Sequence, residues 1–454
     1  MPRFAHSAEF AAPVQELFAW HERPGSLERL LPPWRPLRLV SRGGIRTGDT
    51  AAFELGSGPL RVPLLVSYRD FEAGRRFASE QVSGPFAHWR HERVFRGEGA
   101  AGSVLEERID CALPGPAAWL PGGVLERALA RDAAFRERRL HDDLARHARA
   151  GAPAQRIAIT GATGLIGRAL ADFLTSGGHR VLRFVRRAAR RADEIAWDPA
   201  RGVLEPRSLE GLDAVVHLAG ESIAGARWTA AQKRRIRDSR VQSTRLLADA
   251  LARLARPPRV WLSASALGIY GDRADAPLDE SSALGNDFLA GVCRDWEAAA
   301  APAAAAGIRV VHPRIGIVLA AHGGALAPML LQFRACAGGP VGSGAQYLSW
   351  ISLDDAVGAL HHLLFADAVQ GPVNLAAPAP LSSREFAAVL GRVLRRPARL
   401  ALPAAAVSLL LGEMGRALLL GSARLVPARL RDSGFRWLQP QLEGALRAEL
   451  GLAK

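Results

Sequence analysis

The chain has 454 residues, of which 49% are hydrophobic and 23% charged, a composition typical of a soluble globular protein with two or three domains. The formal net charge is +15, but the basic residues are spread through the sequence and their short clusters lack interleaved aromatic residues, so we expect no nucleic-acid partner. Three widely separated cysteines form no Cys-x-x-Cys or Cys/His cluster, which argues against disulfides and a metal site and favours a reducing, cytoplasmic location.

The N-terminal segment has no uninterrupted apolar run, so we expect no secretory signal. An opening strand is expected around Phe4–Phe10, followed by short helices at Pro13–Trp20 and Ser26–Leu31. Strand-like runs separated by glycine follow at Leu37–Ser41, Thr50–Leu55, Leu60–Phe71, Arg76–Val82, His88–Phe95 and Ser103–Ala112. A long helix closes the unit, with Leu125, Leu129, Ala133, Leu140, Leu144 and Ala148 on one face. This order predicts an α+β domain over residues 1–148, followed by a linker at 149–155.

The segment HERPGSLERLLPPW (His21–Trp34) in this unit resembles the helix-grip family of START and polyketide-cyclase-like ligand-binding domains. The resemblance implies a curved sheet around the long helix and a cavity for a hydrophobic small molecule. Six aromatic residues could line that cavity or could instead fill an ordinary core: Trp20, Trp34, Phe53, Phe71, Phe86 and Trp89. His88 and His91 would point to opposite faces of their strand, which makes a metal site there unfavourable.

The segment RIAITGATGLIG (Arg156–Gly167) has the pattern of a strand, a glycine turn and the start of a helix. Its spacing is G-x-x-G-x-x-G and therefore differs from the strict G-x-G-x-x-G fingerprint. Glycines here allow a tight turn, let backbone N–H groups approach a pyrophosphate and let the helix pack on the strand. We expect a dinucleotide site whose pyrophosphate is held by Gly161, Thr163, Gly164, Leu165, Ile166 and Gly167.

From Arg156 onward, strands and helices alternate, which is typical of a parallel α/β sheet. Strands are expected at Arg156–Thr160, Arg180–Val185, Ala214–Leu218, Arg259–Ser263, Gly307–Pro313 and Arg314–Leu319, and helices at Ser243–Ala255 and Trp296–Ala306. The pattern predicts a doubly wound Rossmann-type domain over residues 156–454, with a smaller substrate lobe from about 270–290 and 320–450. The apolar segment Ala404–Ser422 is interrupted by Glu413 and Arg416, which favours a buried helix pair over a membrane span.

The second expected strand ends at Arg186 and Arg187, where an acidic residue would favour NAD by binding the ribose 2′-hydroxyl. A guanidinium suits a 2′-phosphate instead, so the sequence favours NADP(H), with a solvated basic turn as the alternative. Ser263 ends a later strand at the carboxyl edge of the sheet, where open α/β folds bind their ligands.

Four segments resemble the extended short-chain dehydrogenase/reductase superfamily, in its nucleoside-diphosphate-sugar epimerase-like group: GATGLIG (161–167), HLAG (217–220), SASALGIYG (263–271) and PRIGIVLA (313–320). A narrower resemblance, to atypical bacterial epimerase-like proteins with a conserved C-terminal domain, is carried by ESIAGARWT (221–229), SRVQSTRLL (239–247), NDFLAGVCRDWEAAA (286–300) and RLRDSGFRW (429–437). The resemblance implies that Leu218, Ala219 and Gly220 lie along the cofactor and that Ser265 matches the catalytic serine or threonine.

The chain departs from this superfamily at the proton relay, a Tyr-x-x-x-Lys pair. The residues four positions after Tyr68, Tyr270 and Tyr347 are Glu72, Ala274 and Ile351. If Glu297 aligns with the glutamate usual four residues after the lysine, Cys293 takes the lysine position and Leu289 the tyrosine position. Three alternatives follow: an acid/base relocated to Tyr270, Asp287, Cys293 or Glu297, protonation by substrate or water, or cofactor binding without turnover. Cys293 could also be a small buried hydrophobic residue.

These observations predict an NADP(H)-binding oxidoreductase or epimerase acting on an unknown small molecule, with Ser265 orienting a carbonyl or hydroxyl group. The N-terminal unit would hold a hydrophobic ligand. The alternative is a sensor that binds NADP(H) and a hydrophobic ligand without catalysis. The sequence predicts neither the substrate nor the oligomeric state.

Overall fold

The computed structural model describes residues 3–58, 60–99, 101–115 and 122–452. The chain forms two units, of which the first spans residues up to Gly151 together with Asp172–Gly178. The second spans Ala152–Ala171 and His179–Leu452. Within the described residues, no helix is both long and apolar enough to cross a membrane.

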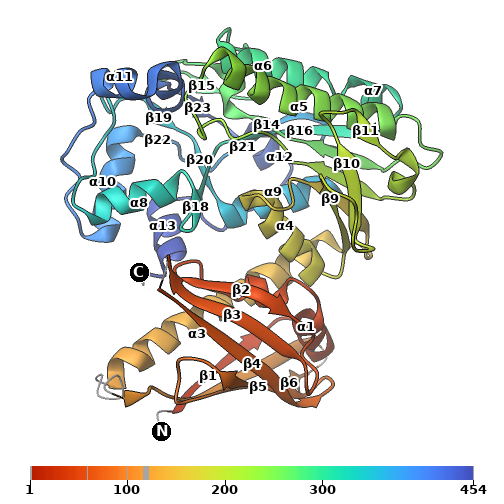
Figure 1. Ribbon diagram of the computed structural model, residues 1–454, viewed down its shortest axis with the longest axis vertical. Coiled ribbons are helices and arrows are strands. Elements are labelled where there is room, and N and C mark those ends of the chain that lie inside the picture. The colour runs from red at the N-terminus through yellow and green to blue at the C-terminus, as the bar shows by residue number, and fades with distance from the viewer. Residues whose placement is uncertain (1–2, 59, 100, 116–121, 453–454) are drawn as a thin grey trace. The chain divides into compact units, whose positions relative to one another are not determined.

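The first unit is built on an antiparallel sheet with the strand order β1-β7-β6-β5-β4-β3-β2 (Figure 1). Its elements are β1 (Arg3–Phe10), α1 (Val14–Glu22), α2 (Ser26–Arg29), β2 (Leu37–Arg42), β3 (Thr50–Ser57), β4 (Leu60–Glu72), β5 (Arg76–Ser83), β6 (His88–Glu98), β7 (Gly102–Ala112) and α3 (Gly122–Ala150). All the strands expected between residues 37 and 112 are present. The order of one strand, two helices, a run of strands and a long helix is also as expected.

The long helix α3 is fixed to the sheet by apolar and ionic contacts. Leu140 and Leu144 join the core that Trp20 and Phe53 also fill. Glu107 of β7 accepts hydrogen bonds from Arg136 of α3 at 2.9–3.1 Å. These contacts cover one face of the sheet, as an α+β layer structure requires.

The six aromatic residues that could have lined a ligand cavity pack against other side chains. Trp20 and Phe53 are buried in the core, and Phe71 and Phe86 pack against its edge. Trp34 stands edge-on to Phe135, and Trp89 tilts against Phe86, with ring centroids about 5 Å apart in both pairs. Their placement agrees with the core alternative.

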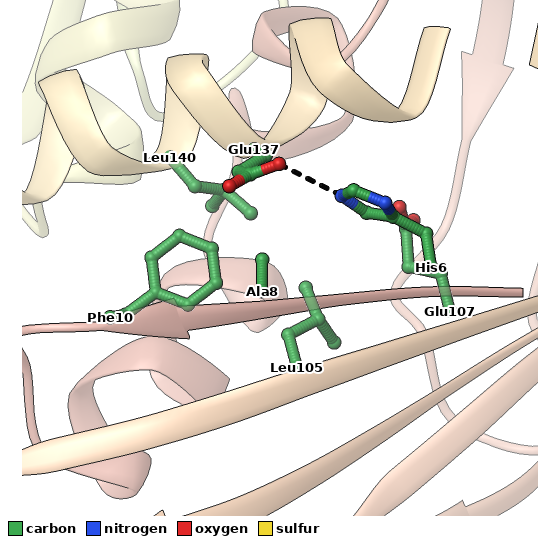
Figure 2. A pocket seen from close by; sticks show the side chains of 7 residues that line it. All are labelled: His6, Ala8, Phe10, Leu105, Glu107, Glu137 and Leu140. Carbon is green, nitrogen blue, oxygen red and sulfur yellow. Dashed lines mark hydrogen bonds and ion pairs between the residues drawn. The ribbon is translucent and has the colours of Figure 1, made fainter. Parts of the chain in front are cut away.

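A cavity in this unit is lined by a different set of residues, from β1, β7 and α3 (Figure 2): His6, Ala8, Phe10, Leu105, Glu107, Glu137 and Leu140. His6 Nε2 and Glu137 Oε2 lie 2.9 Å apart across it. The centre of a water molecule can lie within a volume of about 10 Å³ in this cavity. The cavity therefore has room for a single water.

The second unit is a doubly wound α/β domain whose strands run parallel in the order β10-β9-β8-β12-β13-β16-β21. Its first half contains β8 (Arg156–Thr160), α4 (Leu165–Ser176), β9 (Arg180–Val185), β10 (Glu194–Asp198), β11 (Val203–Leu204), η2 (Pro206–Leu209), β12 (Ala214–His217), α5 (Ala230–Leu251), β13 (Val260–Ser263), β14 (Ser265–Ala266), η3 (Leu267–Tyr270), β15 (Pro277–Leu278), α6 (Phe288–Ala298), α7 (Ala301–Ala305) and β16 (Arg309–Ile315). Helices α5 and α7 cover one face of the sheet, and α9 lies on the other (Figure 1).

The remaining elements are β17 (Ile317–Ala320), β18 (Gly323–Gly324), α8 (Leu326–Arg334), β19 (Tyr347–Leu348), β20 (Trp350–Ser352), α9 (Leu353–Phe365), β21 (Gly371–Leu375), β22 (Leu381–Ser382), α10 (Ser383–Leu394), α11 (Ala404–Gly415), η4 (Arg416–Leu420), β23 (Arg424–Leu425), α12 (Ala428–Asp432) and α13 (Leu442–Leu450). A separate core joins β17, α8, β20, α10 and α13 into a lobe. Strand β15 pairs with β23, which connects the segment around residues 277–278 to the end of this lobe.

Two expectations about helices are wrong. Helix α5 begins at Ala230, well before the expected Ser243, because the Thr229 side chain caps it by accepting the Gln232 N–H. The segment Ala404–Ser422 is not a buried helix pair, since Leu409 and Leu410 on α11 are 79% and 65% exposed.

Candidate functional site

The glycine turn between β8 and α4 is shaped by very close backbone contacts. Gly161 has φ +68°, and a Cβ there would lie 2.9 Å from the Leu218 carbonyl group. A Cβ on Gly167 would lie 2.2 Å from the Gly161 carbonyl oxygen. Only glycine fits these two positions, so the turn packs closely against Leu218 and against the first turn of α4. Thr163 and Gly164 are exposed in this turn, and Leu165 and Ile166 begin the helix.

This turn lies at the point where the strand order reverses. The chain continues from β8 to β9 on one side, while β12 lies on the other side of β8. In open α/β sheets, ligands bind in the crevice outside the carboxyl ends of the strands at this point. Thr160, His217 and Ser263 end β8, β12 and β13 in register, and therefore lie side by side at the crevice.

A buried hydrogen-bond network holds the turn after β12. Thr160 Oγ1 accepts the N–H groups of Leu218 and Ala219, both at 3.1 Å, and lies 2.7 Å from His217 Nδ1. His217 Nε2 lies 3.2 Å from the Ser243 hydroxyl on α5. Burial, with a smaller effect from Arg240, lowers the pKa of His217 to about 3, so this imidazole is neutral. The network fixes the backbone of residues 218–220 beside the glycine turn.

Ser263 and Ser265 bring two buried hydroxyl groups to the same edge. They are 0% and 2% exposed, and neither Oγ has a hydrogen-bond partner among the described residues. Ser265 lies next to the Cys293 thiol, but the two do not have hydrogen-bond geometry. Because an unsatisfied buried hydroxyl costs about 1–3 kcal/mol, such groups are expected where a ligand completes the site.

The two arginines after β9 differ in their surroundings. Arg187 forms two hydrogen bonds to Glu194, at 2.6 and 2.8 Å, and this contact holds the pKa of Glu194 at about 2. Arg186 is exposed and has no ion pair with any described residue. Arg186 can therefore reach a ligand at the end of β9, whereas Arg187 stabilises the turn between β9 and β10.

Tyr270 and Glu297 belong to a buried network. Tyr270 donates its O–H to Asn374 Oδ1 at 2.7 Å and accepts Arg314 Nη1 at 2.9 Å. Glu297 accepts two hydrogen bonds from Arg314, at 2.9 and 3.0 Å. Burial raises the pKa of Tyr270, so its proton stays on the phenol and points to Asn374. Through these hydrogen bonds, Tyr270 connects η3 to β16 and β21, and Glu297 connects α6 to β16.

The other two acid/base candidates, Cys293 and Asp287, are also held by contacts within the protein. Cys293 lies in an apolar cluster with Ile269 and Leu278, and burial raises the pKa of its thiol to about 12. It is a neutral thiol and carries no charge that could replace a lysine. Asp287 is the N-cap of α6 and accepts the Ala290 N–H at 2.8 Å.

Sequence reasoning missed one residue of the site, Arg240. A Cβ on Gly220 would lie 3.1 Å from its guanidinium carbon, so the guanidinium lies against the turn after β12. Its side chain also stacks on Trp296, with the guanidinium carbon 5.2 Å from the ring centroid. Arg240 lies in the motif SRVQSTRLL, but the helix expected from the sequence begins after it, at Ser243. Membership of that motif was the one feature of the sequence that pointed to Arg240.

The chain is similar to proteins described as epimerases. A profile of the NAD dependent epimerase/dehydratase family matches residues 157–376, and a domain of unknown function, DUF1731, matches residues 402–449. The epimerase family protein Mb2239 of Mycobacterium bovis is 43% identical over 281 residues, which are 62% of this chain and 93% of that protein.

Two crystal structures extend the similarity. The nucleoside-diphosphate sugar epimerase of Corynebacterium glutamicum is 31% identical, with a TM-score of 0.80, over 99% of this chain and 90% of that one. The human epimerase family protein SDR39U1 (isoform 2), crystallised with NADPH, is 34% identical, with a TM-score of 0.59, over 65% of this chain and 99% of that one.

Proposed function

The chain belongs to the NAD-dependent epimerase/dehydratase family, and we propose that it is an NADP(H)-dependent oxidoreductase or epimerase acting on a small organic molecule. The observation that carries this proposal is the glycine turn at the β8/β12 switch point, where a Cβ on Gly161 or Gly167 would collide with the backbone and where the N-terminus of α4 follows. The human relative that was crystallised with NADPH supports the same cofactor.

Each half of the cofactor has residues suited to it. Gly161, Thr163, Gly164, Leu165, Ile166 and Gly167 would hold the pyrophosphate at the N-terminus of α4. The exposed guanidinium of Arg186 would bind the 2′-phosphate, and Arg187 would keep the turn in place through Glu194. Leu218, Ala219, Gly220 and Ser263 would border the nicotinamide half. When bound, NADP(H) supplies or accepts a hydride.

The substrate would lie beside Ser265, between the sheet and the lobe formed by residues 270–290 and 320–450. The hydroxyl of Ser265, which has no hydrogen-bond partner among the residues that the structure describes, would donate a hydrogen bond to a substrate carbonyl or hydroxyl. Proton transfer by Tyr270, Cys293, Asp287 or Glu297 is disfavoured by their contacts, which favours a proton from the substrate or water.

For the N-terminal unit we infer a helix-grip fold of the START and polyketide-cyclase type. The order of one strand, two helices, a meander of strands and a long helix supports this assignment. A hydrophobic ligand would have to widen the space between β1, β7 and α3, because the cavity there has room for only about one water (Figure 2).

Single-turnover spectroscopy tests the catalytic proposal. NADPH bound to the full chain is mixed with a broad set of carbonyl compounds, and its absorbance and fluorescence are followed. We expect oxidation with at least one compound, and Ser265→Ala to slow that reaction by about 100-fold. NADPH that binds but is never oxidised would favour the non-catalytic sensor.

A further inference from the structure

The segment 395–410 joins the end of α10 to α11 and contains arginines and leucines but no acidic residue. Its first part contains three exposed arginines: Arg395, Arg396 and Arg399. None of the three forms an ion pair with a carboxylate of a described residue, whereas Arg392, one turn earlier on α10, pairs with Glu443. The positive charge of the segment is therefore not neutralised by direct contact.

The rest of the segment exposes four leucines: Leu400 (62%), Leu402 (39%), Leu409 (79%) and Leu410 (65%). In the described part of the second unit, the other exposed large hydrophobic residues are Val203, Leu284 and Leu331. The backbone here is nevertheless fixed, because the N–H groups of residues 400 and 402 donate to the carbonyl oxygens of Gly338 and Pro340, at 3.2 and 2.9 Å. Exposed leucines gathered on a fixed backbone indicate an interaction surface.

Helix α8 extends this surface. Its exposed side carries Leu331, which is 74% exposed, and Arg334, which forms no ion pair with a described residue. Residues 322–353, which include α8, contain no acidic residue. In Figure 1, α8, α10 and α11 lie on the same side of the second unit, opposite β9 and β10. We call Leu331, Arg334 and the segment 395–410 the basic apolar surface.

Charge and composition favour one kind of partner for this surface. Two copies of the chain that met through it would bring arginines against arginines, which like-charge repulsion disfavours. Protein partners are usually held by aromatic anchors, and the basic apolar surface contains no Trp, Tyr or Phe. An anionic lipid bilayer offers phosphate groups to the arginines and acyl chains to the leucines, and requires no fitted pocket.

We propose that the basic apolar surface binds the protein to the surface of a bilayer that contains anionic lipids. The leucines enter the boundary between head groups and acyl chains, and the arginines contact the lipid phosphates. This binding does not rest on the proposed function, because it uses no side chain assigned there to the cofactor or the substrate.

Co-sedimentation of the full-length chain with lipid vesicles tests this proposal. One set of vesicles contains phosphatidylcholine alone, and the other contains phosphatidylcholine with about 30% phosphatidylglycerol. We expect binding to the second set to be about tenfold or more tighter than to the first, and to weaken at high salt. Leu409→Ser combined with Leu410→Ser should weaken it about tenfold or more, because two leucines no longer enter the bilayer.

Substitution of the arginines tests the electrostatic part. The triple variant Arg395→Gln, Arg396→Gln and Arg399→Gln should bind the phosphatidylglycerol vesicles about 100-fold more weakly, and Arg399→Gln alone about fivefold. Two matched controls should leave binding unchanged. Leu60→Ser removes a leucine that is 82% exposed on β4, and Arg201→Gln removes an exposed arginine in the turn after β10. Thermal unfolding checks that each variant is folded, as expected for exposed side chains.

Each other outcome would overturn the proposal. If the unaltered chain does not bind phosphatidylglycerol vesicles, the surface is not a lipid-binding surface. If the arginine variants weaken binding but the leucine variant does not, attraction by charge alone explains the result. Equal losses in Arg201→Gln and Arg399→Gln would show that only net charge matters. If sedimentation velocity shows self-association that the leucine variant abolishes, and vesicles are not bound, the surface is an interface between copies.

Discussion

Hydroxyl groups at the carboxyl edge of the second unit fall into two kinds. The Tyr270 hydroxyl both donates and accepts hydrogen bonds in a buried network with Asn374 and Arg314. The hydroxyls of Ser263 and Ser265 are equally buried but have no hydrogen-bond partner in the part of the chain that the structure describes. The first kind stabilises the fold, while the second costs stability until a ligand provides an acceptor or donor.

This contrast predicts opposite effects for two substitutions. Tyr270→Phe should lower the free energy of unfolding by about 1–3 kcal/mol, because Asn374 Oδ1 loses its donor and Arg314 Nη1 loses one acceptor, and should leave NADPH affinity unchanged. Ser265→Ala should change stability by no more than about 0.5 kcal/mol, while slowing turnover. Urea denaturation and NADPH titration measure both quantities. A loss of NADPH affinity in Tyr270→Phe at unchanged stability would contradict this division.

Arg186 and Arg187 provide a matched pair for testing cofactor choice. Arg186→Ala should reduce the preference for NADPH over NADH about 10-fold to 100-fold, because a charge-assisted contact to the 2′-phosphate is lost. Arg187→Ala removes the same charge from a side chain already engaged by Glu194, and should change the preference much less. Equal effects of the two variants in competitive binding would show that only the overall charge of this turn matters.

His217 predicts a dependence of stability on pH. Its folded-state pKa of about 3 lies below the ordinary histidine pKa of 6.5, so below pH 6.5 the unfolded chain takes up a proton that the folded chain does not. The free energy of unfolding should therefore fall as pH falls through this window, by about 1.4 kcal/mol per pH unit for each such histidine. Between pH 6 and 5, His217→Asn should have a slope smaller by about one proton, measured by urea denaturation. An unchanged slope would show that His217 is not buried as a neutral imidazole.

In the turn between β8 and α4, glycine has two effects: it allows a positive φ, and its lack of a Cβ allows a close backbone contact. Comparison with a second glycine separates these effects. Gly161 and Gly202 have nearly identical φ values, +68° and +69°, but a Cβ on Gly202 would contact nothing within 4 Å. Gly202→Ala should cost about 1–2 kcal/mol from backbone strain alone. Gly161→Ala should cost about 1–3 kcal/mol more through its contact with Leu218, and should also weaken NADPH binding. If urea denaturation gave equal losses of unfolding free energy for Gly161→Ala and Gly202→Ala, close packing of Gly161 against Leu218 would be contradicted.

Elements were predictable from the sequence where local pattern decides them. The strands β8 and β9 have the expected bounds, since short, mostly buried apolar runs and flanking glycines mark them. Strands β10 and β21 were both missed. The pairing of β21 with β16 joins residues distant in sequence, whereas β10 pairs with the neighbouring β9. The start of α5 was also missed, because a run of arginines conceals its apolar periodicity.

The candidate site was predictable to a similar extent. The glycine turn and the strand-end serines follow from local sequence, and the structure brings them to one edge. The partners of Tyr270 could not be foreseen, since Arg314 and Asn374 lie 44 and 104 residues away. Arg240 was missed for the same reason, because its place beside the turn after β12 depends on contact with Gly220.

At the scale of the molecule, the chain combines two different sheet designs. The first unit has an antiparallel meander and its own core, and the second has a parallel doubly wound sheet with a core on one face and another in the lobe. The expected linker at residues 149–155 contains Gly151, where the first unit ends.

Equilibrium binding of NADPH and NADH to the full-length chain, followed by cofactor fluorescence, tests the cofactor assignment most directly. We predict saturable binding of one NADPH per chain, about tenfold or more tighter than that of NADH, because only NADPH offers a 2′-phosphate to Arg186. Failure to bind NADPH, or tighter binding of NADH, would contradict the assignment of this crevice to NADP(H).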